Sequence, residues 1–125
     1  TAASLRAKAF GMDVVMYDPY RENGAELSVG VKRTHSLEDL FARSDVVSVH
    51  APLSDATEKL INEQILKASK PGLILINTAR GPIVDLDALY HALKNDEIQA
   101  VGLDVHQIIL HRLWLVKLWV SQFLP

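Results

Sequence analysis

The amino-acid sequence predicts an α/β fold built on a doubly wound parallel sheet. Short apolar runs typical of buried strands alternate along the chain with patterns typical of helices of about ten residues. Such alternation indicates crossover units on a parallel sheet. The apolar runs lie at residues 14–17, 45–50, 73–77 and 98–105. The chain has 125 residues, the length of one ordinary domain.

The start of the chain predicts a helix followed by a strand. Residues 2–10 place apolar side chains on one helical face, and Gly11 follows where a left-handed C-cap would lie. The apolar run at 14–17 is uninterrupted and ends at Asp18-Pro19. Such a run is typical of a strand that is buried on both faces.

The middle of the chain predicts a weak strand, a short helix and a second buried strand. A polar segment with a turn signal leads to the weak strand candidate at 31–34. Ser36 and Asp39 resemble a capping box, which predicts that a short helix begins there and includes Phe41. The run at 45–50 is the next strand.

The second half of the chain predicts two more pairs of a helix and a strand. Asn62 can cap a short helix, and the apolar run at 73–77 follows it as a strand. The last helix carries one apolar stripe formed by Leu86, Leu89, Tyr90 and Leu93. The final strand ends at Asp104, so each predicted helix leads into a strand of the same sheet.

Composition and charge limit the possible functions. Hydrophobic residues make up 49% of the chain and charged residues 22%, which is typical of a globular domain. The net charge of -2 is small and evenly spread, which disfavours binding to nucleic acid by charge. The absence of cysteine excludes a disulfide framework and a thiolate metal site, and no metal is expected. The first residues lack the features of a secretory signal, so the cytoplasm is the expected location.

Residues 108–125 form a divergent apolar tail of unknown structure, and we expect the domain to occupy residues 1–107. His111, Arg112 and Lys117 interrupt a stretch that is barely long enough to span a bilayer, so no membrane span is expected. As a helix the tail would present one apolar face, suited to a protein core or a membrane surface. The preferred alternative is a stretch without an evolved partner, such as the product of an altered reading frame.

Asp18 is the first candidate functional residue because it ends a predicted strand, and open parallel sheets bind ligands beyond the carboxyl ends of their strands. A carboxylate there can accept hydrogen bonds from both hydroxyls of an adenosine ribose. It would repel a 2′-phosphate by about 4 kcal/mol at a separation of roughly 4 Å, which favours NAD over NADP. The alternative is that Asp18 only begins a turn with Pro19.

Arg80 is the second candidate, since the segment KPGLILINTARGPIVD at 70–85 places it on a loop just past a strand. Its planar guanidinium can bind a carboxylate with two parallel hydrogen bonds, a geometry that lysine cannot copy. Gly81 allows a close approach of the backbone. The alternative for Arg80 is an ordinary surface salt bridge.

Four motifs occur together in this chain: Tyr17-Asp18, His50-Ala51-Pro52-Leu53, NTARGPIVD at 77–85 and Gly102-Leu103-Asp104-Val105. In their order and approximate spacing, residues 1 to about 106 resemble the NAD-binding domain of the D-isomer-specific 2-hydroxyacid dehydrogenases. The stretches LRAKAFG and YDPY are similar to the C-terminal-binding-protein branch, which includes transcriptional corepressors as well as bacterial enzymes. HAPL looks more like the enzymes, because the animal corepressors usually carry a cysteine at the position of Ala51.

The resemblance implies an NAD-dependent oxidoreductase that reduces a 2-keto acid to a 2-hydroxy acid with NADH. Arg80 would be the catalytic residue that binds the carboxylate and the carbonyl of the substrate. Six residues would contact NAD: Asp18 at the adenosine ribose, Ala51, Pro52, Thr78 and Ala79 along the cofactor, and Asp104 at the nicotinamide end. The resemblance also implies a homodimer in the complete form. Asp18 and Arg80 are expected to face one crevice.

The resemblance also identifies what this chain does not carry. The family uses a His to protonate the keto oxygen and a Glu to hold that imidazole and raise its pKa. Ile109 stands at about the position of the Glu, and neither His106 nor His111 is expected to replace the His. The 13 residues before the strand with Asp18 match the interval that follows the family's GxGxxG turn. The first strand and the glycine-rich turn are therefore expected to be missing.

These expectations lead to two functional hypotheses, beside a third interpretation in which the chain has no activity and comes from an incomplete gene model. The first is a fragment of an NAD-dependent 2-hydroxyacid dehydrogenase that binds NAD poorly, is inactive alone and does not form a stable monomer, because the central strand of the order 3-2-1-4-5-6 is absent. The second is a piece of an NAD-sensing transcriptional corepressor, which would work in the nucleus. The two share a fold, so the fold does not choose between them.

Overall fold

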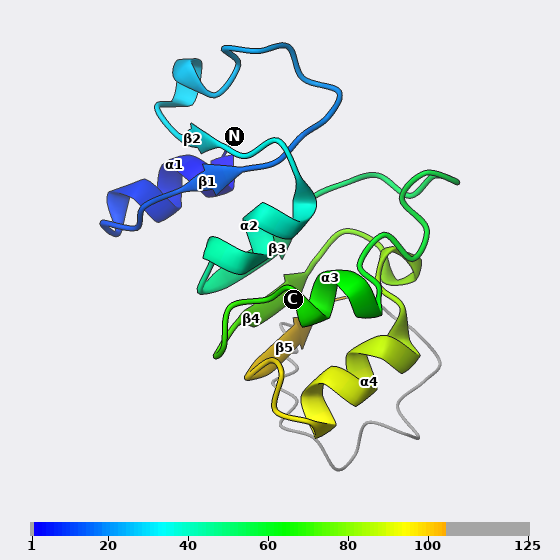
Figure 1. Ribbon diagram of the computed structural model, residues 1–125. Coiled ribbons are helices and arrows are strands. Elements are labelled where there is room, and N and C mark those ends of the chain that lie inside the picture. Colours follow the sequence, from blue (N-terminus) through cyan, green and yellow to red (C-terminus); the bar gives the residue numbers. More distant parts are fainter. Residues whose placement is uncertain (1, 105–125) are drawn as a thin grey trace, which may run out of the picture. The chain divides into compact units, whose positions relative to one another are not determined.

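The computed structural model describes residues 2–104, which form two compact units divided between Leu40 and Phe41 (Figure 1). The predicted tail at 108–125, the boundary at 107 and residues His106 and Ile109 lie outside the described residues. No helix within residues 2–104 is long and apolar enough to cross a bilayer.

The first unit contains α1 (Ala2–Ala9) and a two-stranded parallel sheet of β1 (Val15–Met16) and β2 (Lys32–Arg33). The predicted helix and both predicted strands are therefore confirmed. Gly11 follows α1 with a φ of 80°, in the left-handed region that the C-cap prediction requires. A 3-10 helix (Leu27–Val29), which the sequence analysis does not predict, lies between the two strands in the chain.

The prediction that the strand at 14–17 is buried on both faces is wrong. The residues of β1 are half-buried. Within the described residues, β1 pairs with β2 alone, with Val15 opposite Lys32. The faces of a parallel sheet are covered by helices packed against it, and no residue of α1 is buried, so the apolar side chains of β1 keep part of their surface in solvent.

The helix α2 (Leu37–Arg43) leads the chain from the first unit to the second. The hydroxyl oxygen of Ser36 accepts a hydrogen bond of 3.1 Å from the backbone N–H of Asp39, which confirms the predicted cap. Phe41 is fully buried, as the apolar spacing of this helix predicts.

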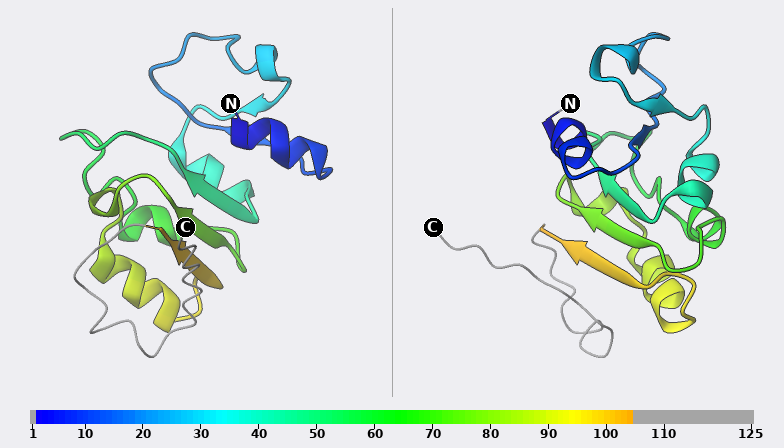
Figure 2. Two further views of the ribbon diagram at one scale, coloured as in Figure 1. Left: turned by 180° about the vertical axis from the view of Figure 1, so that it is seen from behind. Right: turned by 90° about the vertical axis from the view of Figure 1, so that its left-hand side faces the viewer.

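The second unit contains a parallel sheet of β3 (Val46–Val49), β4 (Ile74–Asn77) and β5 (Ala100–Leu103), in that spatial order. The helices α3 (Glu63–Lys67) and α4 (Leu86–Lys94) lie on one side of this sheet (Figure 2). Fully buried side chains between these elements form the core, among them Leu66, Leu73, Leu75, Ile83, Leu89, Ile98 and Val101. A 3-10 helix (Gly81–Ile83) follows β4.

Both helices of the second unit begin at capping residues. Asn62 Oδ1 accepts a hydrogen bond of 3.1 Å from the backbone N–H of Ile65, as predicted. Asp85 Oδ1 accepts hydrogen bonds from the backbone N–H groups of Asp87 at 3.1 Å and Ala88 at 3.2 Å. These caps fix the residues at which α3 and α4 begin.

The strand order agrees with the predicted fold class. Each sheet by itself matches a part of the doubly wound order: β1 and β2 are parallel neighbours, as positions 2 and 3 are, and β3, β4 and β5 follow one another, as positions 4, 5 and 6 do. Within residues 2–104, β1 pairs with no strand other than β2, and β3 with none other than β4. The chain is therefore an incomplete doubly wound α/β domain, as the sequence predicts.

Candidate functional site

Six of the predicted site residues follow the carboxyl ends of the strands in the second unit. Val49, Asn77 and Leu103 end β3, β4 and β5 in matching register. The loops that follow these residues therefore leave the sheet at one edge, which is where parallel sheets bind ligands. The six residues are Ala51 and Pro52 after β3, Thr78, Ala79 and Arg80 after β4, and Asp104 after β5.

Asn77, the last residue of β4, shapes the loop that carries Arg80. Its side chain is fully buried. Asn77 Oδ1 accepts a hydrogen bond of 3.0 Å from the backbone N–H of Ala79, and Nδ2 donates one of 2.9 Å to the backbone carbonyl of Arg80. Both ends of the amide thus close the same turn. Sequence reasoning assigned Asn77 no role, although an amide at the end of an apolar strand is a signal for such a turn.

The guanidinium of Arg80 is exposed beyond this turn. Arg80 Nη1 donates a hydrogen bond of 2.7 Å to the carbonyl oxygen of the preceding residue, Ala79. No carboxylate within residues 2–104 forms an ion pair with Arg80, so the alternative of a surface salt bridge finds no partner in this part of the chain. The guanidinium keeps donors that an incoming carboxylate can use.

The loop after β3 is fixed by Thr57, which sequence reasoning missed. Thr57 is buried, and its hydroxyl donates a hydrogen bond of 2.7 Å to the backbone carbonyl of Pro52. The same oxygen accepts a hydrogen bond of 2.8 Å from the backbone N–H of Ser54. Ala51 is half-buried and Pro52 is exposed. The loop is thus accessible to solvent on one side, and the hydroxyl of the buried Thr57 is bonded to its backbone.

Asp104 lies directly beside the turn that Asn77 begins. The backbone N–H of Asp104 donates a hydrogen bond of 3.1 Å to the carbonyl oxygen of Asn77, which extends the pairing of β4 with β5 by one residue. Asp104 and Thr78 are both exposed at this edge. The structure thus brings the predicted residues of β4 and β5 together.

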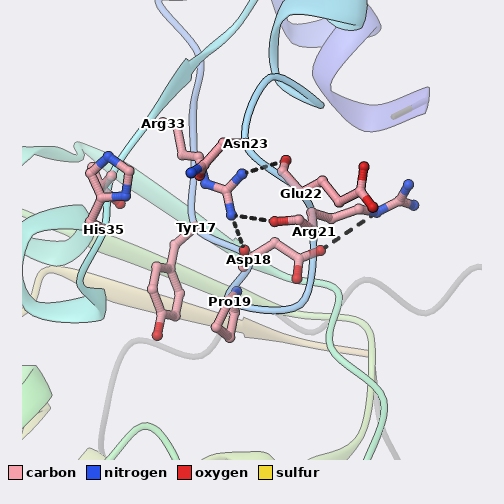
Figure 3. Close-up of a pocket in the computed structure, with 9 residues that line it drawn as sticks. Tyr17, Asp18, Pro19, Arg21, Glu22, Asn23, Arg33 and His35 are labelled. Carbon is pink, nitrogen blue, oxygen red and sulfur yellow. Dashed lines mark hydrogen bonds and ion pairs between the residues drawn. The ribbon is translucent and has the colours of Figure 1, made fainter.

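Asp18 lies in the first unit, two residues beyond β1. It lines a cavity of about 430 Å³ together with neighbours on its own loop and residues 33–35 (Figure 3). Asp18 Oδ1 accepts a hydrogen bond of 3.0 Å from the backbone N–H of Tyr20, so the turn that the alternative predicts is present. Asp18 Oδ2 lies 3.8 Å from Arg21 Nε, and 37% of the Asp18 side chain stays exposed. That Asp18 and Arg80 serve one crevice stays a prediction.

The loop of Asp18 is held by Arg33, the last residue of β2, which sequence reasoning also missed. Arg33 Nη2 donates hydrogen bonds to the backbone carbonyls of Asp18 at 2.6 Å and Arg21 at 2.7 Å. Arg33 Nη1 donates one of 2.8 Å to the carbonyl of Glu22 and lies 3.5 Å from Glu26 Oε2. Figure 3 shows the guanidinium between the carbonyls of this loop.

Glu26 is the carboxylate partner of this guanidinium. Its oxygens accept hydrogen bonds from the backbone N–H of Gly24 at 3.1 and 3.2 Å. Hydrogen bonds from backbone N–H groups, its own first and then that of Gly24, together with Arg33, hold the pKa of Glu26 below its ordinary value. Glu26 is therefore ionised at neutral pH and balances the charge of Arg33.

Comparison with known proteins matches residues 1–109 to one family model, described as the D-isomer specific 2-hydroxyacid dehydrogenase, NAD binding domain. The chain is 35% identical over 109 residues to C-terminal-binding protein 1 of Caenorhabditis elegans, covering 87% of this chain and 15% of that protein. It is 39% identical over 102 residues to D-3-phosphoglycerate dehydrogenase of Methanocaldococcus jannaschii, covering 82% of this chain and 20% of that protein. The chain thus spans a fifth or less of the length of these two relatives.

Solved structures show the same fold. A D-lactate dehydrogenase from Aquifex aeolicus, complexed with NAD and lactic acid, superposes with a TM-score of 0.76 and is 40% identical in sequence. The match covers 84% of this chain and 31% of that chain.

Proposed function

Because the chain belongs to the D-isomer specific 2-hydroxyacid dehydrogenase family, in its NAD-binding domain, we propose that it is the cofactor-binding part of an oxidoreductase that reduces a 2-keto acid with NADH. The observation that carries this proposal is that Arg80, exposed and without a carboxylate partner in residues 2–104, and Asp104 follow the carboxyl ends of the neighbouring strands β4 and β5. NAD is the cofactor of this domain family.

The residues present fit parts of NAD. Asp18 offers an exposed carboxylate in a cavity of about 430 Å³, which suits the two hydroxyls of the adenosine ribose. Ala51, Pro52, Thr78 and Ala79 would line the cofactor, and Asp104 would face its nicotinamide end. The bound cofactor supplies the hydride. The protein residues orient the two reactants so that this transfer takes place inside one complex.

Arg80 would bind the carboxylate and the carbonyl of the substrate. Its guanidinium donates one hydrogen bond to the carbonyl of Ala79 in the absence of substrate. A substrate carboxylate can accept two parallel hydrogen bonds from the same guanidinium. Because the carboxylate is charged, these bonds are shorter and stronger than a bond to a neutral acceptor such as the carbonyl of Ala79. Asn77 would keep the backbone of Arg80 in place during this exchange.

We further propose that the 125-residue chain does not turn over substrate on its own. Within residues 2–104, the edge at β3, β4 and β5 presents no histidine paired with a glutamate for protonating the keto oxygen. That function would belong to other parts of the whole protein, which we propose to be a homodimer.

The test is a kinetic assay of the full-length protein that carries this chain, with NADH and a panel of 2-keto acids. Arg80→Ala should lower kcat/KM by about 10²–10³-fold, the usual cost of removing a positioned donor from a reacting carbonyl. Arg80→Lys should restore little, since lysine lacks the planar fork. Arg6→Ala, on the exposed face of α1, is the matched control. Undiminished turnover by Arg80→Ala would refute the assigned role.

A second candidate function is an NAD-sensing transcriptional corepressor. The similarity to C-terminal-binding protein 1 and the stretch YDPY at 17–20 favour it. This candidate predicts that NADH promotes self-association of the full-length protein, while the panel of 2-keto acids gives no turnover. Sedimentation with and without NADH, read beside the kinetic assay, separates the two functions.

A further inference from the structure

The loop that carries Asp18 is organised around the buried guanidinium of Arg33. The side chain of Arg33 is only 10% exposed, although arginine is rarely buried unless its charge is paired. It reaches the loop from the end of β2, so the contacts join residues that are 11 to 15 positions apart in the chain. The guanidinium is thus an internal support of the first unit.

The geometry of this support depends on arginine. Three carbonyl oxygens, from Asp18, Arg21 and Glu22, accept hydrogen bonds of 2.6, 2.7 and 2.8 Å from two different nitrogens of Arg33. The planar fork presents five N–H donors in fixed directions, so it can satisfy separate acceptors at once. A lysine ammonium is a compact charge on a flexible stem and cannot reproduce this arrangement.

The same contacts fix Asp18 from two sides. Arg33 holds the backbone carbonyl of Asp18, and the backbone N–H of Tyr20 holds its side-chain oxygen Oδ1. The backbone position and the direction of the carboxylate are both set before a ligand arrives. Preorganisation of this kind strengthens binding because less conformational freedom is lost.

The bonding of Arg33 also bears on phosphate recognition. An arginine near the ribose of a dinucleotide would accommodate the 2′-phosphate of NADP. The guanidinium of Arg33 instead donates to three carbonyls and is paired with Glu26 at 3.5 Å. Its charge is balanced within the loop, so it offers little attraction to a phosphate.

We propose that Arg33 is a positioning residue that sets the preference of this protein for NAD over NADP by holding Asp18 in place. This inference rests on the proposed function, in which Asp18 binds the adenosine ribose. Arg33 acts through the loop, because its guanidinium is bonded to three carbonyls of that loop and paired with Glu26.

The test measures dissociation constants of NADH, NADPH and reduced nicotinamide mononucleotide for the full-length protein by fluorescence titration. Arg33→Met should weaken NADH binding by roughly tenfold, the effect of losing about one charge-assisted hydrogen bond. NADPH binding should change less, so the preference for NADH falls. Binding of the mononucleotide, which lacks the adenosine ribose, should stay unchanged. A merely structural role would weaken all three ligands alike.

Three further variants make the result decisive. Arg33→Lys keeps the charge and should lose the preference for NADH over NADPH, as Arg33→Met should. If Arg33→Met does not fold, the lysine variant alone provides the test. Glu26→Gln leaves the three carbonyl bonds in place and should leave NADH binding unchanged, whereas the loss of its charge leaves Arg33 unbalanced and should strengthen NADPH binding. Arg6→Met on α1 is the control for an exposed arginine. Retention of the preference by Arg33→Lys would overturn the inference.

Asp18→Ala separates this inference from the proposed function. If Asp18→Ala abolishes the preference for NADH and the Arg33 variants do not, the positioning role of Arg33 is wrong and the ribose site stands. If Asp18→Ala leaves the preference intact, the proposed ribose site itself is wrong. If both residues are needed, the variant substituted at both Asp18 and Arg33 should lose no more of the preference for NADH than Asp18→Ala alone, since Arg33 acts only through Asp18.

Discussion

The buried amide of Asn77 is bonded to the backbone of Arg80, with Asn77 Nδ2 donating to the Arg80 carbonyl at 2.9 Å. The residue proposed to bind substrate is therefore supported by a side chain that no substrate could reach. The same division of roles recurs in the loop of Asp18, where the guanidinium of Arg33 donates a hydrogen bond to the backbone carbonyl of Asp18.

Asn77→Ala should destabilise the protein and weaken the site. Removal of the amide leaves the N–H of Ala79 and the carbonyl of Arg80 without their partner, and each lost hydrogen bond should lower the unfolding free energy by about 0.5–1.5 kcal/mol. Urea unfolding measures this change. Asn95→Ala at the exposed end of α4 is the matched control and should cost about 0.5 kcal/mol or less. Equal losses in the two variants would contradict the support assigned to Asn77.

Thr57→Val should loosen the loop after β3 without opening a large cavity. Valine has nearly the shape of threonine but cannot donate to the carbonyl of Pro52 or accept from the N–H of Ser54. The expected cost is about 1 kcal/mol, with faster amide hydrogen exchange at Ser54. Thr57→Ser keeps the hydroxyl and should protect the Ser54 amide nearly as well as threonine. Unchanged exchange in Thr57→Val would show that the loop is held by other contacts.

Asp85 should make the stability of the protein depend on acid pH. Its hydrogen bond from the backbone N–H of Ala88, and then the ammonium of Lys59 at 3.5 Å, hold the pKa of Asp85 below its ordinary value. Because the folded pKa is lower than the unfolded one, the contribution is present above the unfolded value, near pH 4, and is lost as the pH falls through the folded value.

The measurement compares Asp85→Ala and Asp85→Asn with the unchanged protein across the acid range. Asp85→Ala removes the cap of α4 and should cost about 0.5–2 kcal/mol at pH 7. Asp85→Asn keeps an oxygen that can cap the helix but does not titrate. The difference between Asp85→Asn and the unchanged protein should therefore shrink as the pH falls below about 4. A difference that is constant with pH would exclude Asp85 as the titrating group.

Leu89→Ala should be among the most destabilising substitutions in the second unit. Leu89 is fully buried under the sheet, and truncation of a buried leucine costs about 2–5 kcal/mol, depending on how far the cavity collapses. Leu5→Ala is the comparison, since Leu5 is 51% exposed on α1 and should cost about 0.5 kcal/mol or less. Thermal unfolding of the two variants checks the contrast.

The elements with local signals could be predicted from the sequence. Ser36 and Asn62 cap helices because their side-chain acceptors lie three residues before the N–H groups that they bind, and this spacing is visible in the sequence. The parallel strands β3, β4 and β5 are mostly apolar, with Ser48 inside β3 and Asn77 at the end of β4. The position of Arg80 beyond β4 follows from the same pattern.

The supports of the site could not be predicted in this way. Arg33 binds backbone carbonyls 11 to 15 residues away, and every residue type has a carbonyl, so no pattern of side chains marks the contact. Thr57 bonds across a loop whose path depends on the sheet before it. The half-burial of β1 was missed for a related reason, since an apolar run does not reveal which helices pack against its faces.

Arg33 binds main-chain oxygens, so these hydrogen bonds do not depend on which side chains stand at positions 21 and 22. Arg21 and Glu22 contribute only their carbonyls to the guanidinium, so other residue types at these two positions can trace the same path. Divergence at position 22 among related proteins would thus be a poor guide to a change of cofactor, whereas Arg21 lies beside Asp18 in the same cavity. An exchange at Arg33 itself is the event that such a comparison should look for.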